Sequence, residues 1–498
     1  MIFKSDLSEI QSYLEDTSAI RDGYASGVFF AESYSEVSEV LRECSRTQTR
    51  LTLSGNGTGT TGGRIPFGGA VLAMPKLNRI LNIKKNSDGT GTATVQTSAL
   101  LYDVQQAVEE QGLIYTPDPT ERFCFIGGTI ANNSSGARTF KYGATRKYVE
   151  RLKIALSSGE LVEIRRGEIF ADRSGMLTFE TENGTHYEVP VPTYSMPKVS
   201  KHVAGYYAAP NMDLIDLFIG SEGTLGVILE ADLKLLPKPE RIFSGLIYFA
   251  DETNLLNFVN EARERSRHAQ SPNELSARAL EYFDKFSLNF LRPKYPQIPT
   301  EAVGAIFFEQ ELTDSTEDDL LQAWLGLMET HGALIDHSWI ALTPDEQQAI
   351  RDFRHALPAQ VNEWYAKFKQ RKISTDMAVP HHRFPELMKS YQTKCEAEGF
   401  DYILFGHIGD AHLHLNILPK NSDEAKRAKD LYRTFIREAI SMGGTISAEH
   451  GVGKLKAEYL VEMFGEKGIR EMVHVKKAID KSLILNIGNV IPEPYLAD

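Results

Sequence analysis

The sequence is poor in cysteine and has no long apolar run. Its 498 residues include only three cysteines, Cys44, Cys124 and Cys395. They are too few and too scattered for a disulfide framework or an iron–sulfur cluster, so free thiols in a reducing compartment are expected. No apolar run approaches the roughly 18 residues of a transmembrane helix, and the polar, acidic N-terminus lacks the apolar core of a signal peptide. We therefore expect no transmembrane segment and a cytoplasmic location, with peripheral attachment to a membrane left open.

Positive charge is also in deficit. The chain has 54 Lys and Arg against 67 Asp and Glu, a formal net charge of −13. This balance argues against nucleic acid as a partner, because phosphate binding needs concentrated Lys and Arg. It does not exclude a small anionic substrate, since one local arginine can override the average field. The length predicts two to four domains.

The character of the sequence changes near the PKPE segment at 237–240. Before it, short apolar runs alternate with glycine-rich turns. After it, short strands are separated by long polar segments with helical character, the pattern of an α+β fold built on an antiparallel sheet. We predict three such helical segments, at 252–269, 312–331 and 345–369. The predicted regions are 1–237, 238–423 and a C-terminal segment with helices, 424–498.

Glycine is concentrated where the first region has its loops. Ser54–Gly63 holds five glycines in ten residues, and Gly127–Gly136 and Gly220–Gly226 are two further clusters. Glycine lets a ligand approach the backbone, and successive exposed N–H groups bind anions. The spacing fits neither a G-x-x-x-x-G-K-[ST] loop nor a Rossmann turn. The first loop alone could be a mobile surface turn, but three such loops suit a long ligand that carries a pyrophosphate.

The order S-G-N-G-T-G, P-D-P, G-G-T-I-A-N-N and G-S-E-G-T-L-G resembles the FAD-binding domain of the vanillyl-alcohol oxidase and PCMH superfamily. The resemblance implies a PCMH-type domain of two packed α+β subdomains, followed by an α+β substrate (cap) domain. It also implies that the first loop wraps the FAD pyrophosphate and that Gly220–Gly226 lies near the adenine end. Some relatives tether flavin to a histidine in the first loop; no histidine is present here, so noncovalent FAD is expected. The implied FAD contacts are Ser54, Gly55, Asn56, Gly57, Thr58, Gly59, Thr60, Pro117, Asp118, Gly127, Gly128, Thr129, Asn132, Asn133, Gly136, Glu222, Gly223, Gly226, Val227 and Asn486.

A second cluster of polar residues lies near the C-terminus. The sequence YILFGH-IGDA-HLHLNIL, residues 402–418, predicts a strand, a turn and a strand. On an extended strand His412, His414 and Asn416 share a face, and the turn can bring that face toward His407. Imidazoles with one carboxylate form a site for Zn²⁺, Mn²⁺ or Fe²⁺. A buried hydrogen-bond network without metal is the alternative.

The pairing of G-H-x-G-D-x-x-x-H with E-H-G-x-G resembles the D-lactate, D-2-hydroxyglutarate and glycolate dehydrogenase branch of the same superfamily. With it the resemblance covers nearly the whole chain. It implies that His407, His414 and Glu449 bind a divalent metal. His450 is then the base that removes the hydroxyl proton, and Asn416 lies in the substrate pocket.

Two departures from that branch are visible. Relatives commonly have Gly-Asn where this chain has Ala411-His412, so we assign His412 to the substrate pocket, as a new polar contact or a weak influence on the metal site. The usual Asn-Pro-Gly-Lys-like tail reads Asn486-Ile487-Gly488-Asn489. A lysine contact to flavin or substrate is therefore expected to be missing.

The segment IRDFRHALP at 350–358 carries the arginine that the resemblance assigns to the substrate carboxylate, Arg354. A planar guanidinium matches a carboxylate with two hydrogen bonds, although a solvated helix arginine is the alternative. The stretch Ser374–Pro380 resembles D-lactate dehydrogenases and offers no clear cation for a second carboxylate, apart from the nearby Arg371 and Lys372. This favours a monocarboxylate.

The predicted function is FAD-dependent oxidation of a small D-2-hydroxy acid, with hydride transfer to flavin N5 and the proton taken by His450. The D stereochemistry rests on the resemblance alone. Electrons would pass to a quinone, a cytochrome, an electron-transfer flavoprotein or oxygen, and a homodimer is compatible with the sequence. The alternatives are a flavin transferase similar to alkyl-dihydroxyacetone-phosphate synthase and a flavin electron-transfer subunit.

Overall fold

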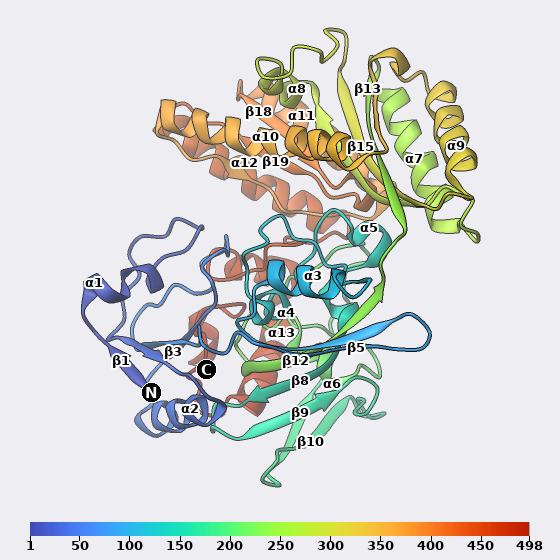
Figure 1. Cartoon of the computed structure of the whole chain (residues 1–498). Coiled ribbons are helices and arrows are strands. Elements are labelled where there is room, and N and C mark those ends of the chain that lie inside the picture. The colour runs from blue at the N-terminus through green and yellow to red at the C-terminus, as the bar shows by residue number, and fades with distance from the viewer. Residues whose placement is uncertain (498) are drawn as a thin grey trace.

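The computed structural model describes residues 1–497, without the side chains of residues 359, 362, 365 and 366. Figure 1 shows two halves: a lower half, formed by residues 1–237 and 457–497, and an upper half, formed by residues 241–441. In the described part of the chain, no helix combines the length and the apolar character needed to cross a membrane. All three cysteines are buried free thiols, as expected from their scatter.

The lower half contains two main sheets and a hairpin. A four-stranded sheet has the order β1 (Ile2–Lys4), β2 (Val28–Phe30), β4 (Ala70–Ala73), β3 (Leu51–Ser54). A six-stranded sheet has the order β5 (Ile80–Lys85), β6 (Gly91–Gln96), β12 (Val227–Pro237), β8 (Val149–Ala155), β9 (Leu161–Arg165), with β7 (Leu113–Ile114) also paired to β12. The hairpin is β10 (Met176–Glu180) with β11 (His186–Pro190). The helices are α1 (Leu7–Ile10), α2 (Tyr34–Thr47), α3 (Leu101–Glu109), α4 (Ile126–Ala131), α5 (Thr139–Tyr142), α6 (Leu214–Phe218) and α13 (Ala457–Ile479).

Helix α2 shows how the sequence sets these elements. Ser33 accepts a hydrogen bond from the Glu36 backbone N–H and so caps the first turn. Residues spaced at helical intervals, Val37, Val40, Leu41 and Cys44, are buried against β3 and β4. The chain leaves the helix at Gln48, whose φ of 55° ends the helical hydrogen bonding. The loop that follows β3 is the glycine-rich segment.

The upper half is built on one antiparallel sheet of seven strands, which confirms the predicted α+β character. Its order is β16 (Trp339–Ala341), β13 (Arg241–Phe249), β15 (Gly304–Leu312), β14 (Ala277–Asp284), β18 (Tyr402–Gly406), β19 (His414–Ile417), β17 (Ile373–Ser374). Its helices are α7 (Glu252–His268), α8 (Lys285–Leu291), α9 (Glu317–Thr330), α10 (Pro344–Phe368), α11 (Phe384–Ala397) and α12 (Ser422–Ser441).

Helices cover both faces of this sheet. Trp324 of α9 stacks on Phe308 of β15, with ring centroids 3.7 Å apart. Phe353 of α10 meets Phe283 of β14 edge to face at 5.6 Å. Successive side chains of a strand point to opposite faces, so Glu281 of β14 shares a face with Phe283 and lies under α10. Arg354 of α10 contacts Glu281, and its side chain therefore lies at the end of the sheet where the turn joins β18 to β19.

The C-terminal part of the chain ties the two halves together. Helix α12 lies in the upper half, and the chain then crosses to α13, which packs against β11 in the lower half (Figure 1). Lys476 of α13 is fully buried. Its Nζ donates to the Thr224 carbonyl at 2.7 Å, the Asp480 carboxylate at 2.6 Å and the Leu485 carbonyl at 2.8 Å. This amine therefore fixes the tail against the Gly220–Gly226 turn.

The Lys476→Met variant should be strongly destabilised. It leaves the Asp480 charge buried without its partner, which costs about 3–5 kcal/mol of unfolding free energy. Chemical denaturation of the purified protein measures the change. Lys467→Met on the same helix is the matched control, because that side chain is 82% exposed and should shift stability by less than about 0.5 kcal/mol. Equal effects of the two variants would contradict the role given to Lys476.

Candidate active site

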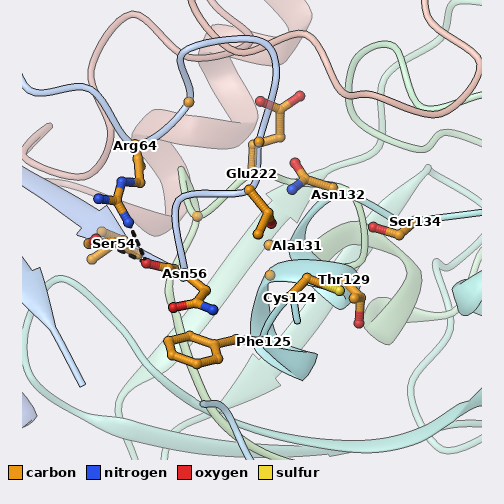
Figure 2. Close-up of a pocket in the computed structure, with 18 of the residues that line it drawn as sticks. Ser54, Asn56, Arg64, Cys124, Phe125, Thr129, Ala131, Asn132, Ser134 and Glu222 are labelled. Carbon is orange, nitrogen blue, oxygen red and sulfur yellow. Dashed lines mark hydrogen bonds between the residues drawn. The ribbon is translucent and has the colours of Figure 1, made fainter. Parts of the chain in front are cut away.

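The glycine clusters meet around one cavity of about 420 Å³ in the lower half. In Figure 2, Ser54 and Asn56 of the first loop, with Arg64 just after it, lie opposite Thr129, Asn132 and Ser134. Glu222 lies between the two groups. At one end the cavity is lined by Glu449 and His450. The residues expected at FAD that line it are Ser54, Gly55, Asn56, Gly57, Thr58, Gly59, Thr60, Gly127, Gly128, Thr129, Asn132, Glu222, Gly223, Gly226, Val227 and Asn486.

Four residues expected at FAD do not line this cavity: Pro117, Asp118, Asn133 and Gly136. The Pro117 carbonyl accepts a hydrogen bond from Gln105, and the Asn133 side chain accepts one from a backbone N–H. Gly136 lies so close to the Asp118 carbonyl that an added Cβ would stand 1.8 Å from its oxygen. These residues hold the second glycine cluster in place behind the cavity wall.

Arg64, which follows the first glycine loop, was not recognised from the sequence. Its Nη1 donates to the Gly55 carbonyl at 2.8 Å and its Nε to the Glu15 carbonyl at 3.0 Å. Gly57 has a φ of 77°, and a Cβ there would lie 2.7 Å from the Arg64 guanidinium. A glycine is therefore required at 57 for the loop to close over this arginine.

The C-terminal tail completes the cavity wall. Asn486 accepts a hydrogen bond from the Leu53 N–H and donates one to the Glu222 carbonyl, both at 2.7 Å. A lysine is present beside this tail although the tail has none: Lys454 Nζ lies 2.7 Å from Asn489 Oδ1. Burial lowers the pKa of Lys454 to about 8. Lys454 lines a neighbouring pocket instead of the FAD cavity.

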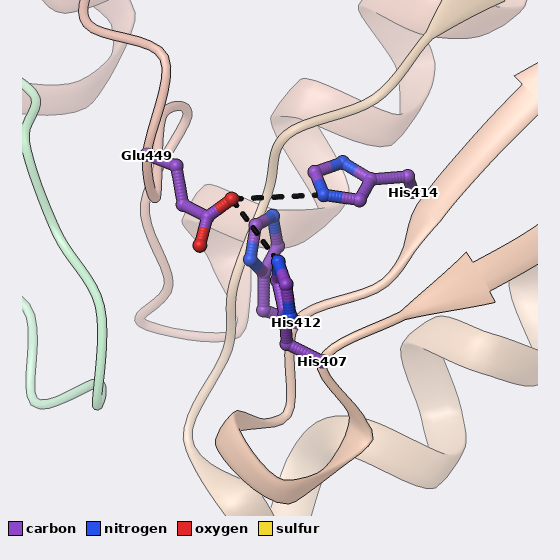
Figure 3. A group of neighbouring side chains, drawn as sticks. All are labelled: His407, His412, His414 and Glu449. Carbon is purple, nitrogen blue, oxygen red and sulfur yellow. Dashed lines mark hydrogen bonds and ion pairs between the residues drawn. The ribbon is translucent and has the colours of Figure 1, made fainter. Parts of the chain in front are cut away.

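Beyond the cavity, three histidines and a glutamate converge (Figure 3). His407 follows β18, His414 begins β19, and Glu449 comes from the loop before α13. Both histidines turn Nε2 toward one oxygen of Glu449, which lies 3.2 Å from His407 and 3.7 Å from His414. His412 completes the group; one ligand atom from each of the four residues lies within 4.8 Å of the others.

The opposite nitrogens of two of these histidines are held by acceptors. His407 Nδ1 lies 2.6 Å from Glu281 Oε1, and His414 Nδ1 lies 3.2 Å from the Thr375 carbonyl. Burial would lower the pKa of His407, but the carboxylates of Glu281 and Glu449 outweigh it and raise that pKa to about 9. A histidine that binds metal usually donates its other N–H to a carboxylate or carbonyl. His407 and His414 both have this arrangement.

Glu449 is held from the lower half through its other oxygen. Lys201, in the loop between β11 and α6, donates to Glu449 Oε1 at 2.5 Å and to the Gly136 carbonyl at 2.7 Å. Ser135 donates to the same carboxylate oxygen at 3.1 Å. The Lys201 side chain is fully buried, and Asp410 lies 3.5 Å from its amine. Lys201 thereby turns the second oxygen of Glu449 toward the histidines.

Asp376 organises the loop that carries Glu449 and His450. It accepts the backbone N–H groups of both residues, at 3.2 and 3.1 Å. Lys456 Nζ and the Ser447 hydroxyl each donate to it at 2.7 Å. Burial would raise the pKa of Asp376, but His450 and Lys456 hold it well below its usual range. Its Oδ2 also lies 3.5 Å from His450 Nδ1.

The remaining predicted residues lie around this cluster. Arg354 contacts Glu281 Oε2 through Nε at 3.2 Å and Nη2 at 3.0 Å, so Glu281 bridges Arg354 and His407. Asn416 is fully buried and donates to the His414 carbonyl at 3.2 Å. His412 is also fully buried. Neither Arg354 nor Asn416 lines the cavity described above.

Comparison with known proteins places this arrangement in a family. Residues 238–490 match the family model of the FAD linked oxidases, C-terminal domain, and residues 25–165 match the FAD binding domain. The chain is 31% identical to the glycolate oxidase subunit GlcD of Bacillus subtilis over 91% of its length and 86% of that protein. The chain belongs to the FAD-linked oxidases. It is therefore an FAD-dependent oxidoreductase.

Other members of the FAD-linked oxidases are similar along most of the chain. A D-lactate dehydrogenase of Anaerostipes hadrus is 30% identical over 92% of this chain and 88% of that protein. A D-2-hydroxyglutarate dehydrogenase of Xanthomonas citri is 27% identical over 98% and 93%. Two solved structures share the fold alone: 4-ethylphenol oxidase from Gulosibacter chungangensis (TM-score 0.71, 17% identity, covering 99% and 95%) and alkyldihydroxyacetonephosphate synthase (TM-score 0.65, 15% identity, covering 97% and 82%).

The Asp376→Asn variant should loosen the loop that carries Glu449 and His450. An amide presents an NH₂ group where the loop N–H groups and Lys456 need an acceptor, and an unsatisfied buried donor costs about 1–3 kcal/mol. We expect the amides of residues 447–450 to exchange with deuterium at least about 10-fold faster, the equivalent of about 1.4 kcal/mol. Asp345→Asn, at the exposed start of α10, is the control. Unchanged protection in Asp376→Asn would show that the loop is held by other contacts.

Proposed function

We propose that this oxidoreductase oxidises a small D-2-hydroxy acid of the D-lactate type to the 2-keto acid. The observation that carries the proposal is the convergence of His407, His414 and Glu449 beside His450, at one end of the FAD cavity. The relatives named for D-lactate, glycolate and D-2-hydroxyglutarate support the same substrate class. The three regions 1–237, 238–423 and 424–498 would then contribute the FAD cavity, the histidine cluster with Arg354, and the Glu449–His450 loop.

The cavity fits noncovalent FAD. Among the described residues that line it, His450 is the one histidine, and it comes from the C-terminal segment instead of the first loop. Cys124 also lines the cavity, and burial raises the pKa of its thiol to about 12. A protonated thiol is a poor nucleophile, so Cys124 is not suited to bind the flavin covalently. The first loop contains neither histidine nor cysteine, so it offers no residue for a covalent bond to the flavin.

The histidine cluster fits a divalent cation. His407 and His414 each keep Nε2 turned toward Glu449, while acceptors hold their Nδ1 atoms, and these imidazole nitrogens with one carboxylate oxygen are borderline donors suited to Zn²⁺, Mn²⁺ or Fe²⁺. When bound, FAD supplies the hydride acceptor and the cation supplies Lewis acidity at the C2 hydroxyl. The protein residues bind the acid and accept its proton.

His450 is placed to accept the hydroxyl proton. Its side chain remains 36% exposed toward the cavity, and Asp376 lies beside Nδ1, so Nε2 can face a substrate. Partial removal of the His450 ring from water lowers its pKa, and this outweighs the opposite effect of Asp376. A neutral imidazole is therefore available near neutral pH.

Arg354 would bind the substrate carboxylate. Two of its nitrogens are held by Glu281, which fixes the direction of the guanidinium, and Nη1 makes no hydrogen bond to the described residues. The nearby cations noted from the sequence, Arg371 and Lys372, are both exposed. With Nε and Nη2 engaged by Glu281, Arg354 has donors left for one carboxylate, which matches a monocarboxylate better than a dicarboxylate.

The transferase alternative has less support. The likeness to alkyldihydroxyacetonephosphate synthase is one of fold at 15% identity, whereas the relatives with 30% and 31% identity are named as a D-lactate dehydrogenase and a glycolate oxidase subunit. The electron-transfer alternative offers no use for a histidine poised beside the cavity. Oxidation of a hydroxy acid uses both the cluster and His450.

His450→Ala should retain flavin and metal but reduce its flavin slowly when mixed with D-lactate. Loss of a general base typically costs 10²–10⁴-fold, so we expect reduction to slow by about 10²-fold or more. Anaerobic stopped-flow absorbance measures the rate. His202→Ala is the control, because this half-buried histidine contacts Thr445 and does not line the cavity. A reduction rate in His450→Ala equal to that of the parent would assign the proton to another group.

A further inference from the structure

His412 is the one histidine of the cluster whose ring nitrogens are left without hydrogen bonds. Its side chain is fully buried, and neither Nδ1 nor Nε2 makes a hydrogen bond to another described residue. Burying an imidazole without partners is unfavourable, because its polar nitrogens lose their contacts with water. The Asp376 carboxylate lies 3.2 Å from Nε2, which leaves Nδ1 without a polar contact among the described residues, and a buried polar atom normally has one.

The backbone holds His412 in this position. Ala411 has a left-handed φ of 54°, and the His412 N–H returns to the His407 carbonyl at 3.2 Å. Ala378 pairs with His412 in an antiparallel bridge from the other side. The turn between β18 and β19 therefore directs the side chain into the cluster as part of the fold.

The ring of His412 lies among the groups assigned to the cation. Its centroid is 4.6 Å from that of His414 and 5.5 Å from that of His407. In Figure 3 the His412 ring lies next to that of His407, on the side of Glu449. One ligand atom from each of His407, His412, His414 and Glu449 falls within 4.8 Å of the others.

Asp376 can satisfy at most one ring nitrogen of His412. Its Oδ1 lies 3.2 Å from His412 Nε2, but the contact is outside hydrogen-bond geometry. The carboxylate already accepts from Lys456, Ser447 and two backbone N–H groups. Asp376 thus has its donors without His412, and at least one nitrogen of the imidazole is left for another partner.

We propose that one ring nitrogen of His412 is a fourth protein ligand to the divalent cation, in a site of three imidazoles and one carboxylate. This assignment rests on the proposed function, which supplies the cation through His407, His414 and Glu449. It replaces the expectation that His412 contacts the substrate. Bonds of about 2.0–2.2 Å to one tetrahedral ion place the ligand atoms roughly 3.4 Å apart, so a pair of atoms at the 4.8 Å limit of the cluster has to approach by roughly 1.4 Å when the ion binds.

A fourth ligand changes the properties of the site. A third nitrogen donor favours Zn²⁺, Co²⁺ or Fe²⁺ over Mn²⁺ and Mg²⁺, which prefer oxygen. Four protein ligands also fill a tetrahedral shell, so the hydroxy acid would bind by expanding the coordination number to five or six. The site should therefore retain its metal strongly and discriminate among divalent ions.

The test counts imidazoles and measures affinity in the flavin-loaded protein. The protein is stripped with a chelator and reloaded with one equivalent of Cu²⁺ for pulsed electron paramagnetic resonance, which reports the number of bound imidazoles. Zn²⁺ affinity is measured in parallel by competition with a chromophoric chelator. The variants are His412→Asn, His414→Ala and His331→Asn; His331, a control remote from the site, contacts Glu261 on α7.

We expect three imidazoles in the parent and two in His412→Asn, with Zn²⁺ affinity reduced at least about 10-fold and unchanged in His331→Asn. Two imidazoles in the parent, with undiminished Zn²⁺ affinity in His412→Asn, would overturn the fourth ligand and leave the proposed metal site standing. Failure of the parent to bind Zn²⁺, or equal affinity in His414→Ala, would overturn the metal site itself. The number of imidazoles bound in the parent protein tests the fourth ligand without any variant. The proposal therefore stays testable even if His412→Asn fails to fold.

Discussion

The carboxylate of Glu449 joins the two halves of the molecule. A carboxylate buried this deeply requires compensating charge and hydrogen bonds on every side. One oxygen receives them from Lys201 and Ser135 of the lower half, and the other faces His407 and His414 of the upper half. Glu449 is thus one direct link between the FAD cavity and the histidine cluster, beside ion pairs such as Arg138–Glu309 and Lys141–Glu311. Because the same loop carries His450, the proposed base is fixed relative to both.

Two further buried carboxylates, Asp376 and Glu281, position the other residues of the proposed active site. Asp376 gathers the backbone of the Glu449–His450 loop and orients the His450 ring. Glu281 bridges Arg354 and His407, so the proposed carboxylate anchor and a proposed metal ligand depend on one group. Each carboxylate thus couples a residue that would touch substrate to the scaffold. The acidic composition of the chain is consistent with this design, since the buried acids are matched locally by lysine, arginine or histidine.

Much of this arrangement could be predicted from sequence order. The three glycine clusters and the G-H-x-G-D-x-x-x-H and E-H-G-x-G segments identify the family, and most of the named glycine-loop residues do line the cavity. The partners of those motifs could not be predicted, because Lys201, Glu281 and Asp376 lie far from them in the chain and become neighbours through sheet pairing and the crossing to α13. Pro117 and Gly136 belong to the recognised motifs but do not line the cavity; they pack behind its wall instead. The unusual Ala411-His412 pair was visible in sequence, but its unpartnered nitrogens were not.

The central claim is that the flavin is reduced directly by a D-2-hydroxy acid, and anaerobic spectroscopy of the purified protein tests it most directly. The flavin-loaded, metal-replete protein is mixed with D-lactate, L-lactate, glycolate and D-2-hydroxyglutarate, and the oxidised flavin absorbance is followed. The account predicts rapid bleaching by D-lactate, slower bleaching by the dicarboxylate and none by the L enantiomer. Flavin that stays oxidised with every acid of the panel would contradict the account.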